Sequence, residues 1–303
     1  MTEQHSIFQE HGRRGFLKAL TGLGVAGLSG AAGWRTPVGM AAESAPAAQT
    51  APSSQPAGKV KFHLGMASYT LRKFPTEQAI TMTKRLGLEW ICFKSFHLPL
   101  EATPEQIAAA VAKVKEAGLR LYSGGVISMS NAQQIQQAFA YAKAAGMQMI
   151  IGSPNPDVLP LVEEEVKKTG VGLAIHNHGP GDKWWPLPQT AYEKIKKLDR
   201  RIGLCIDIGH TVRYGADLVK SVEETADRIL DMHIKDVTEA TAKGRTCPAG
   251  RGVIDLPALL AKLIQIGYSG VCSLEYESEE NDPLPGSAES IGYFRGILAV
   301  IGR

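Results

Sequence analysis

Residues 171–210 read VGLAIHNHGPGDKWWPLPQTAYEKIKKLDRRIGLCIDIGH. The stretch holds an apolar run at 171–175, an amphipathic segment at 190–198 and a second apolar run at 202–206. Short apolar runs that alternate with helical segments predict βα units and a parallel sheet. Each of the two runs is followed by a polar residue that can bind a metal or move a proton, namely His176 and Asp207.

The same alternation extends in both directions over residues 60–303. Further strands are predicted at 62–67, 88–93, 119–123, 147–151, 231–235 and 271–274. Helices are predicted at 75–86, 104–117, 132–145, 156–168, 216–230, 256–266 and 287–301. Eight strand–helix units in a chain of this size predict an α/β fold, a single-domain (β/α)₈ TIM barrel. A doubly wound open sheet is disfavoured because residues 68–72 (SYTLR), which follow the first strand, lack a glycine-rich phosphate loop.

The N-terminal region has the pattern of a targeting segment. Arg13 and Arg14 precede an apolar run at 19–32, and small residues follow near Met40. This order predicts a signal peptide at 1–42 that resembles the twin-arginine type. Residues 43–58 are rich in Ala, Pro, Ser and Gln and predict a flexible linker, so the barrel is expected at 59–303. We expect export to the periplasm, with no stable membrane anchor after cleavage of the signal.

Composition narrows the functional class. The 303 residues carry a net charge of +3, and the basic residues form no stripe with interleaved aromatics, so nucleic acid is not expected as a partner. The four cysteines form no Cys-x-x-Cys pair, and three of them lie in predicted strands. We therefore expect buried thiols rather than a disulfide framework.

Polar residues lie in or directly after the ends of the last four predicted strands. The segments are His176-Asn177-His178, Asp207-Ile208-Gly209-His210, His233-Ile234-Lys235 and Glu275-Tyr276-Glu277. Active sites of (β/α)₈ barrels lie at the carboxyl ends of the strands, and alternate residues of a strand share a face. A divalent metal site is therefore predicted at Asp207, His233 and Glu275, with the metal-capable His176 at the end of the neighbouring predicted strand. Carboxylate and imidazole ligands suit Mn²⁺, Co²⁺, Fe²⁺, Zn²⁺ or Mg²⁺ without selecting one of them.

These segments, together with Gly250-Arg251-Gly252 before the last helical unit, resemble the xylose isomerase-like barrel superfamily of sugar isomerases, epimerases and inosose dehydratases. The resemblance covers residues 60–303. It implies that Asp207, His233 and Glu275 are metal ligands and that Glu275 is a base. In the epimerase branch the fourth ligand is a second glutamate, and here His176 stands in that place. The two-glutamate mechanism of that branch is therefore less secure than the metal site.

Further site residues are predicted from positions after the strands. The catalytic candidates are Glu275, Lys94 and His210, and a lysine at a strand end could neutralise an enolate oxygen. The candidates for substrate binding are the following residues: Tyr69, His97, His178, Lys235 and Arg251.

Three functions remain open at this point. The first is a metal-dependent isomerase or epimerase, in which Glu275 removes a proton next to the metal-bound carbonyl of a keto-sugar. The second is a lyase or hydratase on a 3-keto-sugar or keto-cyclitol, a reading that His176 favours. The third, disfavoured by the retained Asp207, His233 and Glu275, is a non-catalytic sugar-binding barrel. The expected partner is a small sugar or keto-sugar, and a homo-oligomer is possible.

Overall fold

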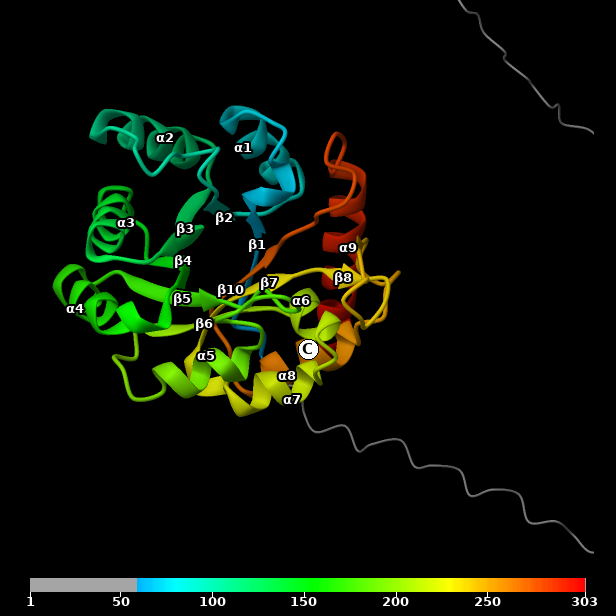
Figure 1. The fold of residues 1–303 in the computed structure, drawn as a ribbon. Coiled ribbons are helices and arrows are strands. Elements are labelled where there is room, and N and C mark those ends of the chain that lie inside the picture. Colours follow the sequence, from blue (N-terminus) through cyan, green and yellow to red (C-terminus); the bar gives the residue numbers. More distant parts are fainter. Residues whose placement is uncertain (1–58, 303) are drawn as a thin grey trace, which may run out of the picture. The chain divides into compact units, whose positions relative to one another are not determined.

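The computed structural model describes residues 59–302, in which eight parallel strands close into a barrel (Figure 1). The order around the wall is β1-β10-β7-β6-β5-β4-β3-β2. The strands are β1 (His63–Ala67), β2 (Trp90–Phe93), β3 (Arg120–Met129), β4 (Met149–Pro154), β5 (Gly172–His176), β6 (Ile202–Asp207), β7 (Ile229–Ile234) and β10 (Val271–Leu274). The predicted (β/α)₈ barrel is confirmed. The predicted signal and linker, residues 1–58, lie outside the described residues.

Helices surround the barrel on its outer side (Figure 1). They are α1 (Thr76–Arg85), α2 (Pro104–Glu116), α3 (Ala132–Ala144), α4 (Leu159–Thr169), α5 (Pro188–Ile195), α6 (Ile208–Arg213), α7 (Leu218–Glu224), α8 (Leu256–Gln265) and α9 (Leu284–Ile301). Short 3₁₀ helices occupy Ser68–Leu71, Pro156–Val158 and Ala226–Arg228. None of the helices within residues 59–302 is both long and apolar enough to cross a membrane.

Local sequence explains where the helices begin and end. At the start of α2, the Thr103 hydroxyl accepts a hydrogen bond from the Gln106 backbone, and the Gln106 side chain accepts one from the Thr103 backbone. This reciprocal cap, with Pro104 in the first turn, fixes the helix start. At the end of α4, Gly170 adopts the left-handed conformation at φ 78°, which favours glycine.

One predicted helix, at 216–230, is wrong in its extent. Instead α6 begins directly after β6, Gly215 at φ 85° separates it from α7, and a 3₁₀ turn precedes β7. The buried Arg228 guanidinium donates hydrogen bonds to four backbone carbonyls, those of Lys196, Leu198, Asp199 and Ile202. These bonds favour the turn over a continuous helix, and β7 begins at Ile229, two residues before the predicted start.

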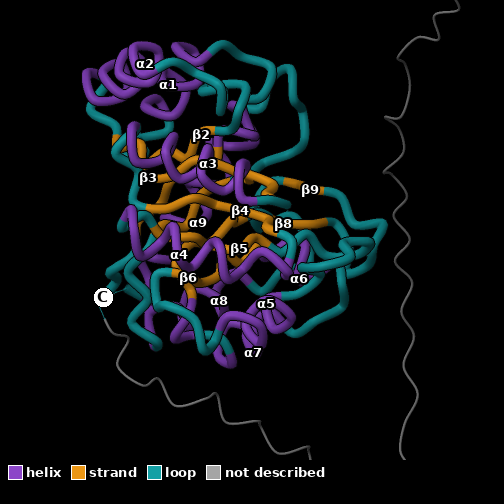
Figure 2. Tube along the Cα trace, turned by 60° about the vertical axis from the view of Figure 1, so that its left-hand side comes forward, coloured by secondary structure: helices purple, strands orange, loops and turns teal. Residues whose placement is uncertain are grey.

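A small antiparallel sheet was not predicted. Strand β8 (Asp236–Val237) pairs with β9 (Thr246–Cys247), and β8 lies beside α6 (Figure 2). The buried Asp236 carboxylate accepts hydrogen bonds from the backbone amides of Gly250, Gly252 and Ile254. Asp236 therefore organises the segment that contains Gly250-Arg251-Gly252.

The inside of the barrel is filled by a cluster that includes polar groups. Tyr122 on β3 donates a hydrogen bond to Asp231 on β7, across the barrel, and lies 2.6 Å from Ser273 Oγ on β10. Cys92 and Cys205 belong to the same interior cluster. All four cysteines are free thiols, as predicted, and Cys92, Cys205 and Cys272 are buried.

Candidate metal centre and active site

The barrel brings the four predicted metal ligands together. His176 ends β5, Asp207 ends β6, His233 lies near the end of β7, and Glu275 directly follows β10. Strand pairing sets Asp207 beside His233, and His233 beside Ser273, two residues before Glu275. All four side chains are buried, and one ligand atom from each lies within 4.8 Å of all the others.

The distances within this group fit a metal ion. His233 Nδ1 lies 3.1 Å from His176 Nε2 and 3.2 Å from Glu275 Oε2. His176 Nε2 lies 3.4 Å from Asp207 Oδ2. Four ligands at about 2.1 Å from one ion in tetrahedral geometry would be about 3.4 Å apart. The buried Asp207 Oδ2 accepts no hydrogen bond of normal geometry, and its charged neighbour is the Lys235 ammonium, 2.9 Å away. The residues present therefore fit a divalent metal.

Asp207 has two roles, one for each carboxylate oxygen. Its Oδ1 accepts a hydrogen bond from the His210 backbone and caps α6, while Oδ2 faces the ligand group. The Asn177 side chain is bonded to the backbone of Asp207 on both sides, accepting from its N–H and donating to its C=O. Burial raises the pKa of Asp207, but the charges of His210 and Lys235 outweigh burial and hold it well below the usual value.

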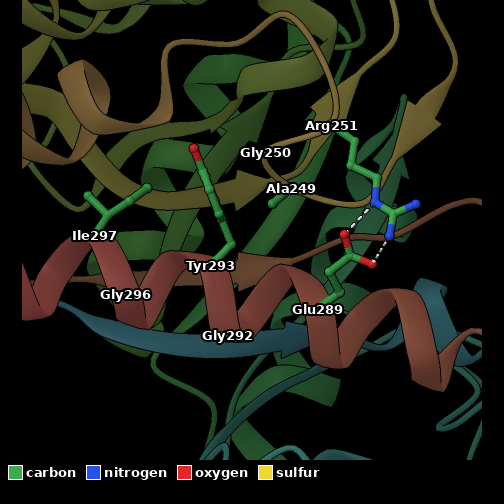
Figure 3. A pocket seen from close by; sticks show the side chains of 8 residues that line it. All are labelled: Ala249, Gly250, Arg251, Glu289, Gly292, Tyr293, Gly296 and Ile297. Carbon is green, nitrogen blue, oxygen red and sulfur yellow. Dashed lines mark hydrogen bonds and ion pairs between the residues drawn. The ribbon is translucent and has the colours of Figure 1, made fainter. Parts of the chain in front are cut away.

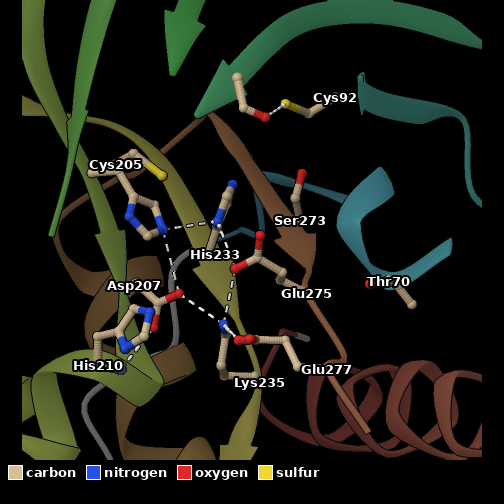
Figure 4. A network of polar contacts seen from close by, with 12 residues as sticks. Thr70, Cys92, Cys205, Asp207, His210, His233, Lys235, Ser273, Glu275 and Glu277 are labelled. Carbon is tan, nitrogen blue, oxygen red and sulfur yellow. Dashed lines mark hydrogen bonds and ion pairs between the residues drawn. The ribbon is translucent and has the colours of Figure 1, made fainter. Parts of the chain in front are cut away.

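Lys235 lies among the carboxylates of the site rather than on the wall of the cavity (Figure 4). Its Nζ is 2.9 Å from both Asp207 Oδ2 and Glu275 Oε2, and it also donates to Glu277. Only 2% of the residue is exposed. Burial lowers the pKa of Lys235, but these three carboxylates together hold it well above its usual value. Lys235 is therefore a positive charge held next to the candidate metal ligands.

The two oxygens of Glu275 face different surroundings. Oε2 faces His233 and Lys235, whereas Oε1 faces Lys94, whose Nζ is 3.7 Å away. Burial raises the pKa of Glu275, but Lys235, His233 and Lys94 outweigh burial and hold it well below its usual value. Glu275 is therefore ionised at neutral pH and can accept a proton.

Asp231 is a carboxylate that the sequence analysis does not predict, and it lies on the side of His233 that faces away from the ligand group. Asp231 is fully buried, and its Oδ2 is 3.9 Å from His233 Nε2, the nitrogen that faces away from the ligand group. Burial raises the pKa of Asp231 to about 6. A carboxylate behind a ligating imidazole orients the ring and favours one tautomer. Asp231 lies two residues before His233 on the same face of the strand, and that spacing was the available signal.

A cavity of about 240 Å³ opens above the ligand group. Its lining contains six of the predicted site residues together with two that were missed, Val126 and Glu277. The six are Tyr69, Lys94, His176, His178, His210 and Glu275. Glu277 lies two residues after Glu275, so it could have been predicted from the alternation of a strand continued past its end.

Besides Lys235, two predicted substrate-binding residues lie outside the lining of this cavity. His97 is buried, with its ring nitrogens 2.8 Å from Ser68 Oγ and 3.1 Å from the Phe74 carbonyl. The Arg251 side chain is 67% exposed and forms an ion pair with Glu289 (Figure 3). The larger cavity beside that pair, about 450 Å³, lies against α9 and contains no metal-ligating group of this kind. The smaller cavity is therefore the candidate active site.

Comparisons with known proteins agree with this fold. The chain is 29% identical over 152 residues to the rhizopine catabolism protein MocC of Rhizobium meliloti. The aligned segment covers 43% of this chain and 44% of that protein. It is 27% identical over 154 residues to inosose isomerase of Bacillus subtilis (strain 168), covering 44% and 55% of the two chains. The chain thus matches about half the length of these curated relatives.

The fold also matches solved structures. An L-ribulose 3-epimerase superposes with a TM-score of 0.65 at 18% identity, covering 79% of this chain and 95% of the epimerase. A family model, the xylose isomerase-like TIM barrel, matches residues 80–297. Because this match covers well over half of the sequence, the chain belongs to the xylose isomerase-like TIM barrel family.

Proposed function

We propose that this protein is a metal-dependent sugar isomerase or epimerase that removes a proton next to the carbonyl of a keto-sugar. The observation that carries the proposal is the placement of Glu275, a buried, ionised carboxylate with one oxygen toward the candidate ligand group and the other toward Lys94 at the cavity. The named activities of the inosose isomerase and the ribulose epimerase support the sugar class.

His176, Asp207, His233 and Glu275 would hold the ion. A divalent ion there would polarise a carbonyl oxygen and so acidify the neighbouring C–H bond. Glu275 Oε1 then accepts the proton from that carbon. The Lys94 ammonium offsets the negative charge that develops on the substrate. His178 and His210 line the same cavity, and an imidazole there can return a proton.

A lyase or hydratase is the second candidate, and His176 favours it. His176 is buried in the ligand group, and burial holds its pKa well below the usual value. It is therefore a neutral ligand and a poor second acid. Burial also lowers the pKa of His178, so proton donation falls to Lys94 or His210. An acid placed near a hydroxyl would promote loss of water as readily as reprotonation of carbon.

Incubation of the Mn²⁺-loaded protein with a panel of keto-sugars in D₂O, followed by NMR, tests both candidates. Deuterium incorporation with an unchanged molecular formula is expected for isomerisation or epimerisation. Loss or gain of water would instead identify a lyase or hydratase. Absence of both exchange and dehydration across the panel would reject the proposed chemistry.

We expect His176→Ala to weaken Mn²⁺ binding by about a hundredfold or more, since the effect of losing a ligand should exceed the 10–100-fold typical of outer-shell changes. Titration against a fluorescent chelator measures the affinity. His97→Ala is the matched control, because His97 is also a buried histidine but lies outside the ligand group. Equal affinities of wild type and His176→Ala would remove His176 from the ligand set.

Metal affinity should rise with pH. Burial lowers the pKa of His233, but the Cys205 thiol and the Glu275 carboxylate more than offset burial, and the net pKa lies above the usual value of about 6.5. His233 Nδ1 therefore carries a proton that must leave before an ion binds. Calorimetry in buffers of different ionisation enthalpy should detect release of about one proton near neutral pH. An affinity independent of pH would argue against His233 as a ligand.

We also propose that the protein is exported by the twin-arginine route and works in the periplasm. Arg13 and Arg14 before the apolar run at 19–32 support this proposal. Replacing both arginines by lysine should leave the protein in the cytoplasmic fraction of the host, as measured by cell fractionation. Unchanged export of the double variant would contradict the route.

A further inference from the structure

An exposed aromatic ring lies beside the candidate active site. Phe96 is 47% exposed and is the only exposed phenylalanine within residues 59–302. Its ring centre is 6.1 Å from that of Tyr69, which lines the cavity. Phe96 also lies two residues after Lys94, another lining residue. The ring is therefore at the edge of the cavity rather than inside it.

Hydrogen bonds fix the backbone around Phe96, and a buried histidine contacts its ring. The backbone N–H of His97 donates to the Lys94 carbonyl and closes a turn around Phe96, and the Lys94 backbone donates to the Ser68 hydroxyl. The His97 ring, itself fixed by Ser68 and Phe74, meets the Phe96 ring edge-on at 4.9 Å. The turn and the His97 contact restrict the position of the Phe96 ring, which lowers the entropic cost of stacking a ligand on it.

The ring of Tyr69 is in contact with two positively charged side chains. The Arg72 guanidinium and the Lys94 ammonium lie 4.8 and 5.1 Å from the centre of its ring. Arg72 is held in turn by Glu280 and by the carbonyl of Glu277. The Tyr69 ring thus lies between the cavity, which it lines, and the exposed ring of Phe96.

The size of the cavity limits what it can hold. Its volume of about 240 Å³ is below the range of roughly 300–1,000 Å³ typical of sites for drug-sized ligands. One sugar ring at the candidate metal ligands would leave a substituent at the rim, next to Phe96. Flat apolar ring faces stack well on an aromatic side chain.

From this arrangement we propose a second subsite, formed by Phe96 and Tyr69, that binds a ring attached to the reacting sugar. The substrate is then a glycoside or disaccharide rather than a free monosaccharide. This inference rests on the proposed function for the identity of the reacting sugar, but the subsite itself can be measured by binding alone.

The test compares unreactive ligands by calorimetry and saturation-transfer NMR, using the full Mn²⁺-loaded protein. The probes are methyl and phenyl glucopyranosides of both anomeric forms, and cellobiose. For at least one anomer, wild type should bind the phenyl glycoside about three- to tenfold more tightly than the methyl glycoside. In Phe96→Ala this ratio should fall to about one, while affinity for the methyl glycoside stays the same. Phe96→Leu, which keeps an apolar side chain, should give an intermediate ratio.

Tyr293→Ala is the control variant. Tyr293 is a 40% exposed aromatic residue on α9, at the larger cavity shown in Figure 3, and its removal should leave the ratio unchanged. The proposal is overturned if wild type does not distinguish the glycosides, if the preference survives in Phe96→Ala, or if no glycoside binds. A phenyl preference that depends on Phe96, in a protein that exchanges no deuterium into keto-sugars, would support the subsite and reject only the proposed chemistry.

Discussion

Glu275→Gln is expected to lower the rate of deuterium exchange into the substrate by about a thousandfold or more, in line with the loss of a general base. Glutamine has nearly the same shape as glutamate but cannot accept a proton at this position. The Glu275 carboxylate is ionised and has one oxygen facing Lys94 at the cavity, so it is the best-placed base among the described residues. Single-turnover NMR at saturating metal measures the loss.

Metal content must be measured in the same sample, because Glu275 Oε2 also belongs to the candidate ligand group. Reduced exchange at full Mn²⁺ occupancy would assign the defect to proton transfer. Glu289→Gln is the matched control, since Glu289 pairs with Arg251 at the larger cavity and should have no effect on exchange. Exchange at the wild-type rate in Glu275→Gln would exclude Glu275 as the base.

The convergence of the four candidate ligands could be predicted because two regularities coincide. Parallel strands of a barrel end on one face, and residues two apart on a strand share a side. His176, Asp207, His233 and Glu275 satisfy both conditions, and strand pairing in the structure brings them together. Once the strand ends were located, the geometry of the site followed from the fold.

Residues on loops could not be placed in the same way. His97 and Arg251 both follow strands in the sequence, but tertiary hydrogen bonds and ion pairs decide where their side chains lie. The amide hydrogen bonds to Asp236 fix the backbone around Arg251, and the Glu289 partner comes from α9, far along the chain. No local pattern in the sequence encodes these contacts.

For Lys235, the alternation of side chains along a strand predicts which side the residue faces but not where its ammonium lies. Its spacing from His233 indicates the same side of the chain, and the sequence analysis predicts that Lys235 binds substrate. The structure instead places its ammonium between Asp207 and Glu275. Periodicity gives the direction of a side chain, whereas the length of the lysine chain and the charges around it determine where the ammonium lies. The pairing of Lys235 with ligand carboxylates therefore emerges only in three dimensions.

Lys235→Met is expected to destabilise the metal-free protein by about 3–5 kcal/mol, the usual cost of removing one partner from a buried ion pair. Methionine fills similar space but leaves Asp207 and Glu275 without their cation. Chemical denaturation in the presence of a chelator measures the difference. Lys262→Met is the matched control, because the exposed carboxylate of Glu223 is its partner and the expected cost is below about 1 kcal/mol.

The same variant should bind Mn²⁺ more tightly than wild type. The Lys235 ammonium shares Asp207 Oδ2 and Glu275 Oε2 with the candidate ligand group, so its charge opposes that of an incoming ion. An ion that binds the folded protein stabilises it by mass action. Saturating Mn²⁺ should therefore recover much of the stability lost in Lys235→Met, and should stabilise the variant more than wild type. Weaker metal binding by the variant would instead mean that Lys235 holds the ligand carboxylates in place, and that its charge does not compete with the ion.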